Sequence, residues 1–246
     1  MIHIKDLSIS IKNKLLINQL NVELKRGEFW AIIGNNGKGK TTLLQTMAGF
    51  NTGYSGSILV DSKELSSLKI LNRAQSIAFL PQMIEAGLNC TVEQSIAYGR
   101  YPWHKHKLDK KNEEQIIDNV IESMQIDDIR KQSIQEISGG ELRKVEIATI
   151  LAQNSEIMML DEPLNHLDMS FRYKLMSLLK QQSQNKTVII VTHDIQYVQE
   201  YCTHVMLLLN NDLIITGTVS QVMTKVNLDK MLGKPLPIRL LNNIYE

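Results

Sequence analysis

The chain is organised around the stretch Gly34-Asn35-Asn36-Gly37-Lys38-Gly39-Lys40-Thr41-Thr42. Two glycines five positions apart, followed by Lys and Thr, form the pattern of a phosphate-binding loop. Glycine lets the backbone bend tightly and bring its N–H groups onto phosphate oxygens. Lys40 can reach the β- and γ-phosphates of a nucleotide, and the hydroxyl of Thr41 can hold Mg²⁺. The whole stretch is therefore predicted to bind a nucleotide.

The residues on either side of this loop agree with that prediction. Residues 29–33 are apolar and predict a buried strand, whereas residues 41–48 predict a helix. A phosphate would then lie at a helix N-terminus, where free N–H groups and the helix dipole favour an anion. The alternative is a glycine-rich strand-to-helix turn that binds nothing, and the matching context counts against it.

Composition places the chain among globular α/β proteins. Its 246 residues allow one large domain, and its 43% hydrophobic and 22% charged content is ordinary for that class. A net charge of +1 does not suggest a nucleic-acid partner. Cys90 and Cys202 form no disulfide framework and fit a reducing compartment. Residues 1–6 lack the apolar core of a signal peptide, and no apolar run approaches the ~20 residues of a membrane helix.

Hydrophobic patterning divides the chain into three parts. Short strands are expected at the start, at Ile2–Ile4, Leu7–Ile11 and Val22–Leu24, with turns at Asn13, Asn18 and Gly27. A helical period dominates from about 85 to 154. Continuous apolar runs then return at 157–160 and 188–191, as expected of buried parallel strands. The prediction is one domain, 1–246, with an α/β core (1–84 and 155–246) and an inserted helical subdomain (85–154).

Two acidic residues follow the apolar run 157–160. Asp161 is placed to hold the Mg²⁺ shell of a phosphate-loop protein. Side chains alternate along a strand, so Glu162 points elsewhere and can orient or deprotonate an attacking water. Taken alone, these acids are equally consistent with a strand end and a solvated turn.

Two further polar residues are weaker candidates. His193 lies two residues after the apolar run 188–191 and could contact the γ-phosphate, although a lone His in such a turn is more often structural. Gln82, after residues 79–81, could coordinate Mg²⁺ or the water through its amide, although a polar turn residue is the simpler interpretation.

A second glycine-bearing stretch, Ser138-Gly139-Gly140-Glu141, precedes a predicted helix at 142–153. Ser138 and Glu141 have the spacing of a capping box. Capping does not explain two adjacent glycines, which weaken a first turn. Serine and two glycines at a helix N-terminus also suit phosphate. Two phosphate sites in one chain make sense if two chains share each nucleotide.

These motifs together resemble the ATP-binding-cassette (ABC) ATPases from end to end. The loop at 34–42 is similar to the Walker A motif, Gln82 to the Q-loop glutamine and residues 137–141 to the Leu-Ser-Gly-Gly-Gln signature, with Ile137 for Leu and Glu141 for Gln. Residues 157–162 resemble Walker B with its catalytic glutamate, residues 164–168 the D-loop and His193 the switch histidine. The resemblance implies a phosphate-loop NTPase core with an antiparallel β subdomain and an α-helical signature subdomain.

The resemblance also assigns roles. ATP and Mg²⁺ are the implied ligands, with Thr41, Gln82 and Asp161 positioning the metal, Glu162 polarising water and His193 holding the γ-phosphate. Residues 138–141 of a second, head-to-tail copy would complete each nucleotide site.

The chain departs from the family at two positions. Where the family stacks adenine on an aromatic side chain, this sequence has Ile11, which retains apolar contact but loses π-stacking. Leu164 replaces a common small or hydroxyl residue before the D-loop, and nothing in the sequence explains that change.

One segment points to a subgroup. Residues 98–104 resemble the Gly-Arg-x-Pro segment of ATPase subunits from importers of iron–siderophore, haem and vitamin B12. The neighbouring His104, Lys105, His106 and Lys107 suggest a metal site or, as the favoured alternative, a solvated basic surface near the permease or lipid headgroups.

The resulting expectation is the ATP-hydrolysing subunit of an importer for an iron chelate, haem or cobalamin. Its expected partners are a second copy of itself, transmembrane permease subunits and, indirectly, a solute-binding protein, with no nucleic acid. It is expected to lie peripherally at the cytoplasmic face of the cell membrane. A manganese or zinc importer ATPase is the nearest alternative, and a soluble non-transport ABC ATPase a more distant one.

Overall fold

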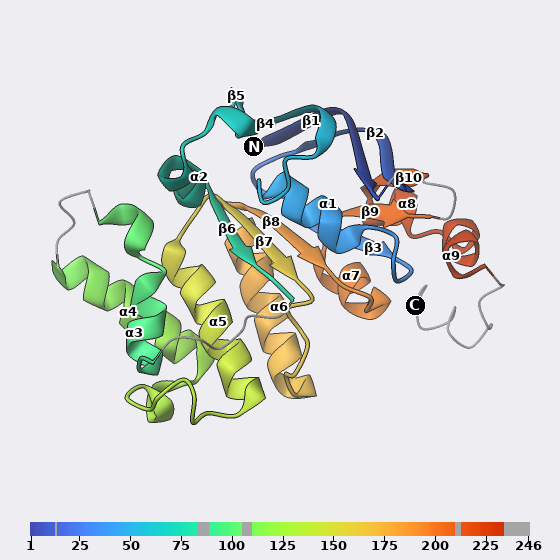
Figure 1. Cartoon of the computed structure of the whole chain (residues 1–246). Coiled ribbons are helices and arrows are strands. Elements are labelled where there is room, and N and C mark those ends of the chain that lie inside the picture. The colour runs from blue at the N-terminus through green and yellow to red at the C-terminus, as the bar shows by residue number, and fades with distance from the viewer. Residues whose placement is uncertain (13, 83–88, 105–109, 210–212, 234–246) are drawn as a thin grey trace. The chain divides into compact units, whose positions relative to one another are not determined.

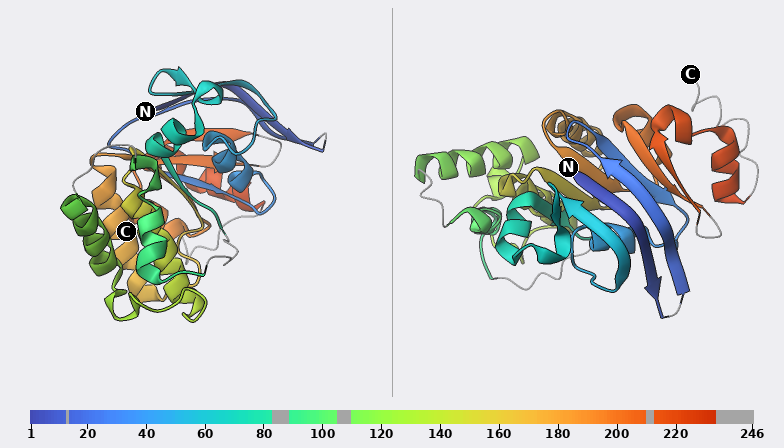
Figure 2. Two further views of the ribbon diagram at one scale, coloured as in Figure 1. Left: turned by 60° about the vertical axis from the view of Figure 1, so that its left-hand side comes forward. Right: turned by 90° about the horizontal axis from the view of Figure 1, so that it is seen from above.

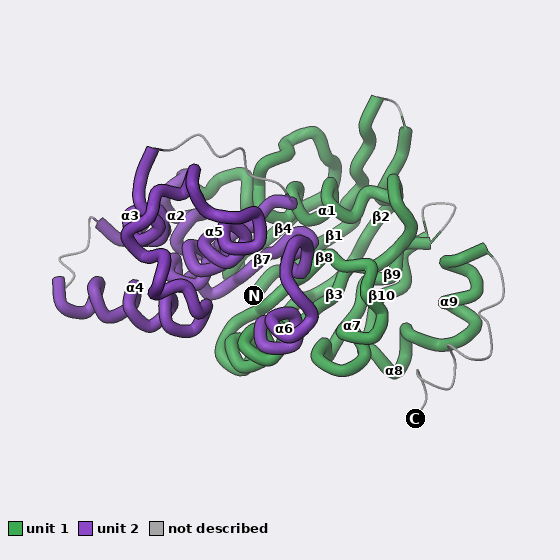
Figure 3. Tube along the Cα trace, turned by 90° about the horizontal axis from the view of Figure 1, so that it is seen from below, with its two compact units in different colours: residues 1–68, 176–246 green, residues 69–175 purple. Residues whose placement is uncertain are grey.

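The computed structural model describes residues 1–12, 14–82, 89–104, 110–209 and 213–233 (Figure 1). It divides into two compact units, residues 1–68 with 176–246 and residues 69–175 (Figure 3). The expected start of the helical subdomain, residue 85, lies outside the described residues. That subdomain boundary therefore stays a prediction.

The first unit contains an antiparallel sheet with strand order β2-β1-β4-β5. The strands are β1 (Ile2–Ile11), β2 (Lys14–Leu24), β4 (Tyr54–Val60) and β5 (Lys63–Glu64). β1 and β2 form a long twisted ribbon (Figure 2). The apolar side chains on one face of β1 are buried. The register between β1 and β2 shifts near Asp6 and Gln19, which both have positive φ. This sheet confirms the antiparallel β subdomain.

The same unit contains a second sheet region built around β3 (Phe29–Gly34). Parallel strands β8 (Thr187–Val191) and β9 (His204–Leu208) flank β3, and β10 (Ile214–Thr218) pairs antiparallel with β9. Because parallel strands are covered on both faces, β8 is buried along its whole length, and so is β3 up to its last residue.

Helices of this unit accompany these strands. They are α1 (Lys40–Met47), α7 (Ile195–Tyr201), α8 (Val219–Val222) and α9 (Lys225–Leu232), with a short 3-10 helix at Leu65–Ser67. α1 packs against β3 and β8. β3 therefore leads through the phosphate loop directly into α1.

The second unit pairs two parallel strands, β6 (Ile77–Leu80) and β7 (Ile157–Asp161). Its helices are α2 (Ile70–Ser76), α3 (Val92–Tyr98), α4 (Lys110–Met124) and α5 (Gly139–Gln153), with 3-10 helices at Tyr101–Trp103 and Asp127–Ile129. The helix α6 (Met169–Ser183) begins in this unit.

Helix α5 is the centre of the second unit, since it contacts α3, α4 and β6. The end of α3 approaches α5 so closely that a Cβ on Gly99 would lie 2.3 Å from the carbonyl oxygen of Thr149. Among the described helices of the chain, none combines the length and the apolar character needed to cross a bilayer.

Candidate functional site

The phosphate loop joins β3 to α1 in the first unit, and its glycines are required for different reasons. A Cβ on Gly34 would lie 2.6 Å from the carbonyl oxygen of Leu208, so no larger residue fits there without a shift. Gly39 has φ of 89°, in the left-handed region that side chains disfavour. Asn36 and Gly37, at the tip, are exposed. The loop is therefore bent with its tip open to a ligand.

Lys40 is the first residue of α1 and is only 8% exposed. Its Nζ donates hydrogen bonds to the carbonyl oxygens of Gly34 at 2.9 Å and Asn35 at 3.2 Å. The amine is therefore held over the loop. Gly39 occupies the N-cap position and has no side chain to cap the helix. The start of α1 thus offers a positive group and backbone N–H donors to an anion.

The loop is anchored from a distant part of the sequence. The side-chain amide of Asn35 donates to the carbonyl oxygen of Met231, in α9, at 2.6 Å. At the other end, Thr41 and Thr42 are half-buried in the first turn of α1, and the Thr42 carbonyl accepts from the hydroxyl of Thr46 at 2.7 Å. Sequence patterns gave no signal for the Asn35 contact, because its partner lies 196 residues away.

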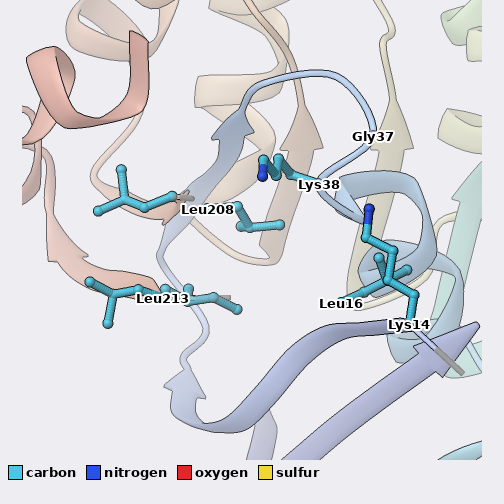
Figure 4. A pocket seen from close by; sticks show the side chains of 8 residues that line it. Lys14, Leu16, Gly37, Lys38, Leu208 and Leu213 are labelled. Atoms are coloured by element: carbon cyan, nitrogen blue, oxygen red, sulfur yellow. The ribbon is translucent and has the colours of Figure 1, made fainter. Parts of the chain in front are cut away.

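A pocket lies beside this loop (Figure 4). It is lined by Lys14, Leu16, Gly37, Lys38, Leu208, Leu209, Leu213 and Ile214. Leu16 approaches the loop closely, since a Cβ on Gly39 would lie 3.2 Å from the Leu16 Cβ. Ile11, which pairs with Lys14 across the β1–β2 ribbon, is 45% exposed. The candidate adenine contact therefore belongs to the same ribbon as the pocket wall.

The acidic pair lies at the end of β7 in the second unit. Asp161, the last residue of the strand, is fully buried, and Glu162 is half-buried. Glu162 has φ of 47°, a left-handed conformation that non-glycine residues seldom adopt. Alternation along a strand was the reason for expecting Glu162 to point away from Asp161, and that reason is wrong. The strand ends one residue earlier, and Glu162 lies in a left-handed turn.

The second glycine-bearing stretch forms the capping box. The Ser138 hydroxyl accepts from the Glu141 N–H at 3.3 Å, and the Glu141 carboxylate accepts from the Ser138 N–H at 2.8 Å. The hydrogen bonds from Ser138 hold the pKa of the Glu141 carboxyl below its usual range. A Cβ on Gly140 would lie 2.9 Å from the carbonyl oxygen of His166, whereas the space beside Gly139 is open. Capping is confirmed, and phosphate binding at this stretch stays a prediction.

The remaining candidates lie at strand ends. Gln82 follows β6 in the second unit and is exposed. His193 follows β8 in the first unit and is also exposed. The first unit thus carries the phosphate loop, Ile11 and His193. The second carries Gln82, residues 138–141, Asp161 and Glu162.

The oxygen donors among these residues fit Mg²⁺. Thr41, Gln82 and Asp161 offer a hydroxyl, an amide carbonyl and a carboxylate, which are hard ligands. Within the described ranges, no group of three His, Cys, Asp or Glu residues could hold a metal ion. Mg²⁺ is usually held by one or two carboxylates together with substrate phosphates, so the donor set suits it without such a group.

Residues 98–104 form a braced surface segment in the second unit. The buried Arg100 donates from Nη1 to the carbonyl oxygen of Ala152 at 2.7 Å, and its Nη2 pairs with Glu113 at 2.8 Å. Tyr98 and Tyr101 are 55% and 67% exposed. Arg100 therefore fixes the backbone while two tyrosines face outward. The basic residues Lys105, His106 and Lys107 lie outside the described residues.

Comparison with known proteins identifies the class. A model of the ABC transporter family matches residues 17–165, more than half of the chain. The chain belongs to the ABC transporter family. It is the ATP-binding subunit, an ATPase that couples ATP hydrolysis to transport.

The individual relatives include ATP-binding proteins of transport systems for different substrates. The petrobactin import ATP-binding protein YclP of Bacillus subtilis (strain 168) is 27% identical, covering 99% of this chain and 97% of the relative. The manganese transport system ATP-binding protein MntB of Listeria innocua is 35% identical, covering 91% and 92%. A solved inward-facing transporter of the metal-chelate type has a TM-score of 0.78 and 27% identity, covering 95% of this chain and 89% of that chain.

Proposed function

We propose that this chain powers the uptake of an iron chelate, haem or cobalamin through a separate permease, with an iron–siderophore complex as the first candidate. The observation that carries the proposal is the similarity to a petrobactin import protein over 99% of the chain. The likeness to a metal-chelate type transporter and the segment 98–104 support it. Manganese import is the second candidate, because MntB is similar over 91% of the chain.

In the proposed reaction, Lys40 and the backbone N–H groups of the loop neutralise the phosphates of ATP. Mg²⁺ would supply charge stabilisation at the β- and γ-phosphates, held by Thr41, Gln82 and Asp161. Glu162 accepts a proton from the attacking water, and His193 donates to the γ-phosphate. Preorganised charges and donors of this kind provide most of the rate enhancement in phosphoryl transfer.

A second copy of the chain is proposed to complete each site. In a head-to-tail pair, residues 138–141 of one copy would face the phosphate loop of the other, and a twofold axis would generate two such sites. The open space beside Gly139 supports this arrangement, because a phosphate could approach the backbone there. Closure on ATP and opening after hydrolysis would then move the permease through different contacts in the two states.

The permease is proposed to dock on residues 98–104 at the cytoplasmic face of the membrane. Two exposed tyrosines on a backbone braced by Arg100 suit a protein contact, since tyrosine is enriched at interfaces. Lys110 and Lys111 begin α4 close by in the sequence and would add attraction to anionic lipid. A solute-binding protein would act on the permease from the other side and would not touch this chain.

Uptake measurements test the cargo. A deletion strain should lose uptake of labelled ferric siderophore, haem or cobalamin and regain it with the wild-type gene. Complementation with Glu162→Gln should fail, because hydrolysis powers the transport. Mn²⁺ and Zn²⁺ uptake should be normal in every strain. Loss of only Mn²⁺ or Zn²⁺ uptake would refute the subgroup assignment and leave the ATPase function intact.

A further inference from the structure

Arg143 lies in the second turn of α5, and only 3% of its side chain is exposed. Its Nη2 donates to the carbonyl oxygens of Asp161 and Glu162, both at 2.9 Å. Its Nη1 donates to the carbonyl oxygen of Pro81 at 3.1 Å and to the carboxylate of Glu146 at 2.9 Å. All of these partners belong to residues 69–175. One buried guanidinium therefore joins α5, the helix that follows Ser138, to the acidic pair at the end of β7 and to the residue before Gln82.

The two carbonyl groups held by Nη2 are on either side of the Glu162 Cα. The Asp161 carbonyl belongs to the peptide before that Cα and the Glu162 carbonyl to the peptide after it. Because peptide groups are planar, fixing both carbonyls fixes the φ and ψ of Glu162. That backbone is in a left-handed conformation with φ of 47°, which persists only where the surroundings hold it. Arg143 thereby sets the direction in which the Glu162 side chain leaves the backbone.

The same guanidinium holds the peptide that leads into Gln82. The carbonyl of Pro81 belongs to the Pro81–Gln82 peptide, and Nη1 donates to it. Hydrogen bonds from a charged donor are stronger than neutral ones, and the planar fork of arginine fixes their directions. Glu146, 11% exposed, balances the buried charge. The backbones of Glu162 and Gln82 are therefore positioned by one side chain of α5.

We propose that Arg143 is a positioning residue for ATP hydrolysis, which aligns Glu162 with the attacking water and links that alignment to the signature stretch. The inference rests on the proposed role of Glu162. Ser138 is the N-cap of α5 and Arg143 lies in its second turn, so a movement of the start of the helix reaches the guanidinium directly. Nucleotide contact at residues 138–141 would thus be transmitted to the water-activating carboxylate within one chain.

A purely structural role for Arg143 makes a different prediction. Removing a buried structural residue lowers thermal stability, but the remaining folded protein hydrolyses ATP at the normal rate. Removing a positioning residue lowers kcat in the folded protein while KM for ATP is kept, because Lys40 and the backbone N–H groups of the phosphate loop are unchanged. The kcat and KM of purified, folded variants therefore distinguish the two roles.

The test compares Arg143→Gln and Arg143→Lys with Arg130→Gln. Arg130 pairs with Glu93 and Asp118 in the same unit, and neither partner belongs to a predicted nucleotide-binding motif. Arg143→Gln should lower kcat by roughly 10–100-fold, the size of effect expected from a misplaced catalytic group, with KM changed less than about twofold. Arg143→Lys should recover part of kcat, because its ammonium can still donate to a carbonyl. Arg130→Gln should leave kcat unchanged.

The double variant separates this inference from the role of Glu162. Glu162→Gln alone should lower turnover by roughly 10²–10⁴, and adding Arg143→Gln should cost little more, because both act on one step. Near-normal turnover in Glu162→Gln would refute the role of Glu162 itself. A full effect of Glu162→Gln with an unchanged kcat in Arg143→Gln would refute the positioning role alone.

A second variant decides the question if Arg143→Gln does not fold. Glu146→Ala removes the acceptor that orients Nη1. A severalfold lower kcat at unchanged KM would support the inference. An unchanged kcat in Glu146→Ala would overturn it.

Discussion

Two helices of this protein begin at glycine-bearing stretches predicted to bind phosphate, and their N-termini differ. α1 follows Gly39, which has a left-handed backbone and no side chain, and the amine of Lys40 lies over the loop. α5 follows Ser138, which forms a complete capping box with Glu141. The N-cap of α1 has no side chain that can accept from the first helix N–H groups, whereas the N-cap of α5 already accepts from one of them, the Glu141 N–H.

The difference indicates how each terminus meets an anion. At α1, a phosphate would find a positive side chain and helix-end N–H groups. At α5, the carboxylate of Glu141 already accepts from the Ser138 N–H and from the Ser138 hydroxyl. A phosphate arriving there meets a like charge unless Glu141 moves. We therefore expect α1 to bind ATP by itself, and α5 to contact ATP only after it is held on a partner copy.

The largest expected effect tests this division of roles. Lys40→Ala should abolish ATP binding and hydrolysis, because the phosphates lose their main positive partner. Ser138→Arg should abolish hydrolysis but leave ATP binding to the isolated chain nearly unchanged. Fluorescent-nucleotide titration and phosphate release measure the two properties.

Mixing the two inactive variants provides the control. One combination of chains pairs an intact loop with an intact signature stretch, so part of the hydrolysis should return, at a rate that coupling between sites can keep low. Loss of ATP binding in Ser138→Arg alone would contradict this division of roles, because both helix N-termini would then bind ATP within one chain.

Features encoded by short, fixed spacing were predictable from the sequence. The phosphate loop lies between a strand and a helix as its pattern indicates, and the apolar runs 157–160 and 188–191 are the buried strands β7 and β8. Such features depend on neighbours in the sequence, which a linear pattern contains.

Three local predictions were wrong for identifiable reasons. The turn expected at Asn18 lies inside β2, and the two short runs at Ile2–Ile4 and Leu7–Ile11 are one strand. Bulges near Asp6 and Gln19 interrupt the alternation of polar and apolar residues, so a continuous strand looks broken in sequence. The helix expected at 142–153 begins at Gly139, because the capping box stabilises a first turn that contains glycine.

Contacts between distant residues could not be predicted. The bond from Asn35 to Met231 and the contacts of Arg143 with Pro81 and Asp161 depend on how the chain folds back on itself. In the sequence, Arg143 is only one cation among the apolar residues of a predicted helix.

A smaller effect is expected from removing the charge of Glu141 at the N-terminus of α5. Glu141→Gln keeps an amide oxygen that can accept from the Ser138 N–H, but it no longer repels a phosphate. ATP-dependent dimerisation should tighten by about tenfold for each of the two nucleotide sites, as expected for one unfavourable charge interaction of about 1.4 kcal/mol per site. Sedimentation with and without ATP measures it, in a hydrolysis-deficient Glu162→Gln background. Unchanged dimerisation would mean that Glu141 already lies clear of the nucleotide.

Acid pH provides an internal check on the same residue. Ser138 lowers the pKa of Glu141 in the folded chain, so the carboxylate contributes stability above its ordinary pKa of 4.5, and this is lost as pH falls through the lowered value. The difference in Tm between wild type and Glu141→Gln should therefore shrink below pH 4.5 and stay constant above it. A difference that grows in acid would contradict the assignment.

The smallest expected effect concerns the affinity for ATP at the phosphate loop that precedes α1. Ile11 offers apolar surface beside the phosphate loop but no ring, and it is 45% exposed. Aromatic stacking is worth about 0.5–1.5 kcal/mol beyond area burial, so Ile11→Tyr should tighten ATP binding by about 2–12-fold. GTP binding should tighten similarly, because every base has a face on which a ring can stack.

Ile11→Leu, which keeps the apolar contact without a ring, is the matched control and should bind ATP as the wild type does. Unchanged affinity in Ile11→Tyr would show that another side chain already covers the base. Ile11 belongs to the ribbon beside the phosphate loop and is remote in sequence from the capping box of α5. Substitutions of Ile11 should therefore change the ATP-dependent contact at α5 only by changing how much ATP is bound at the phosphate loop.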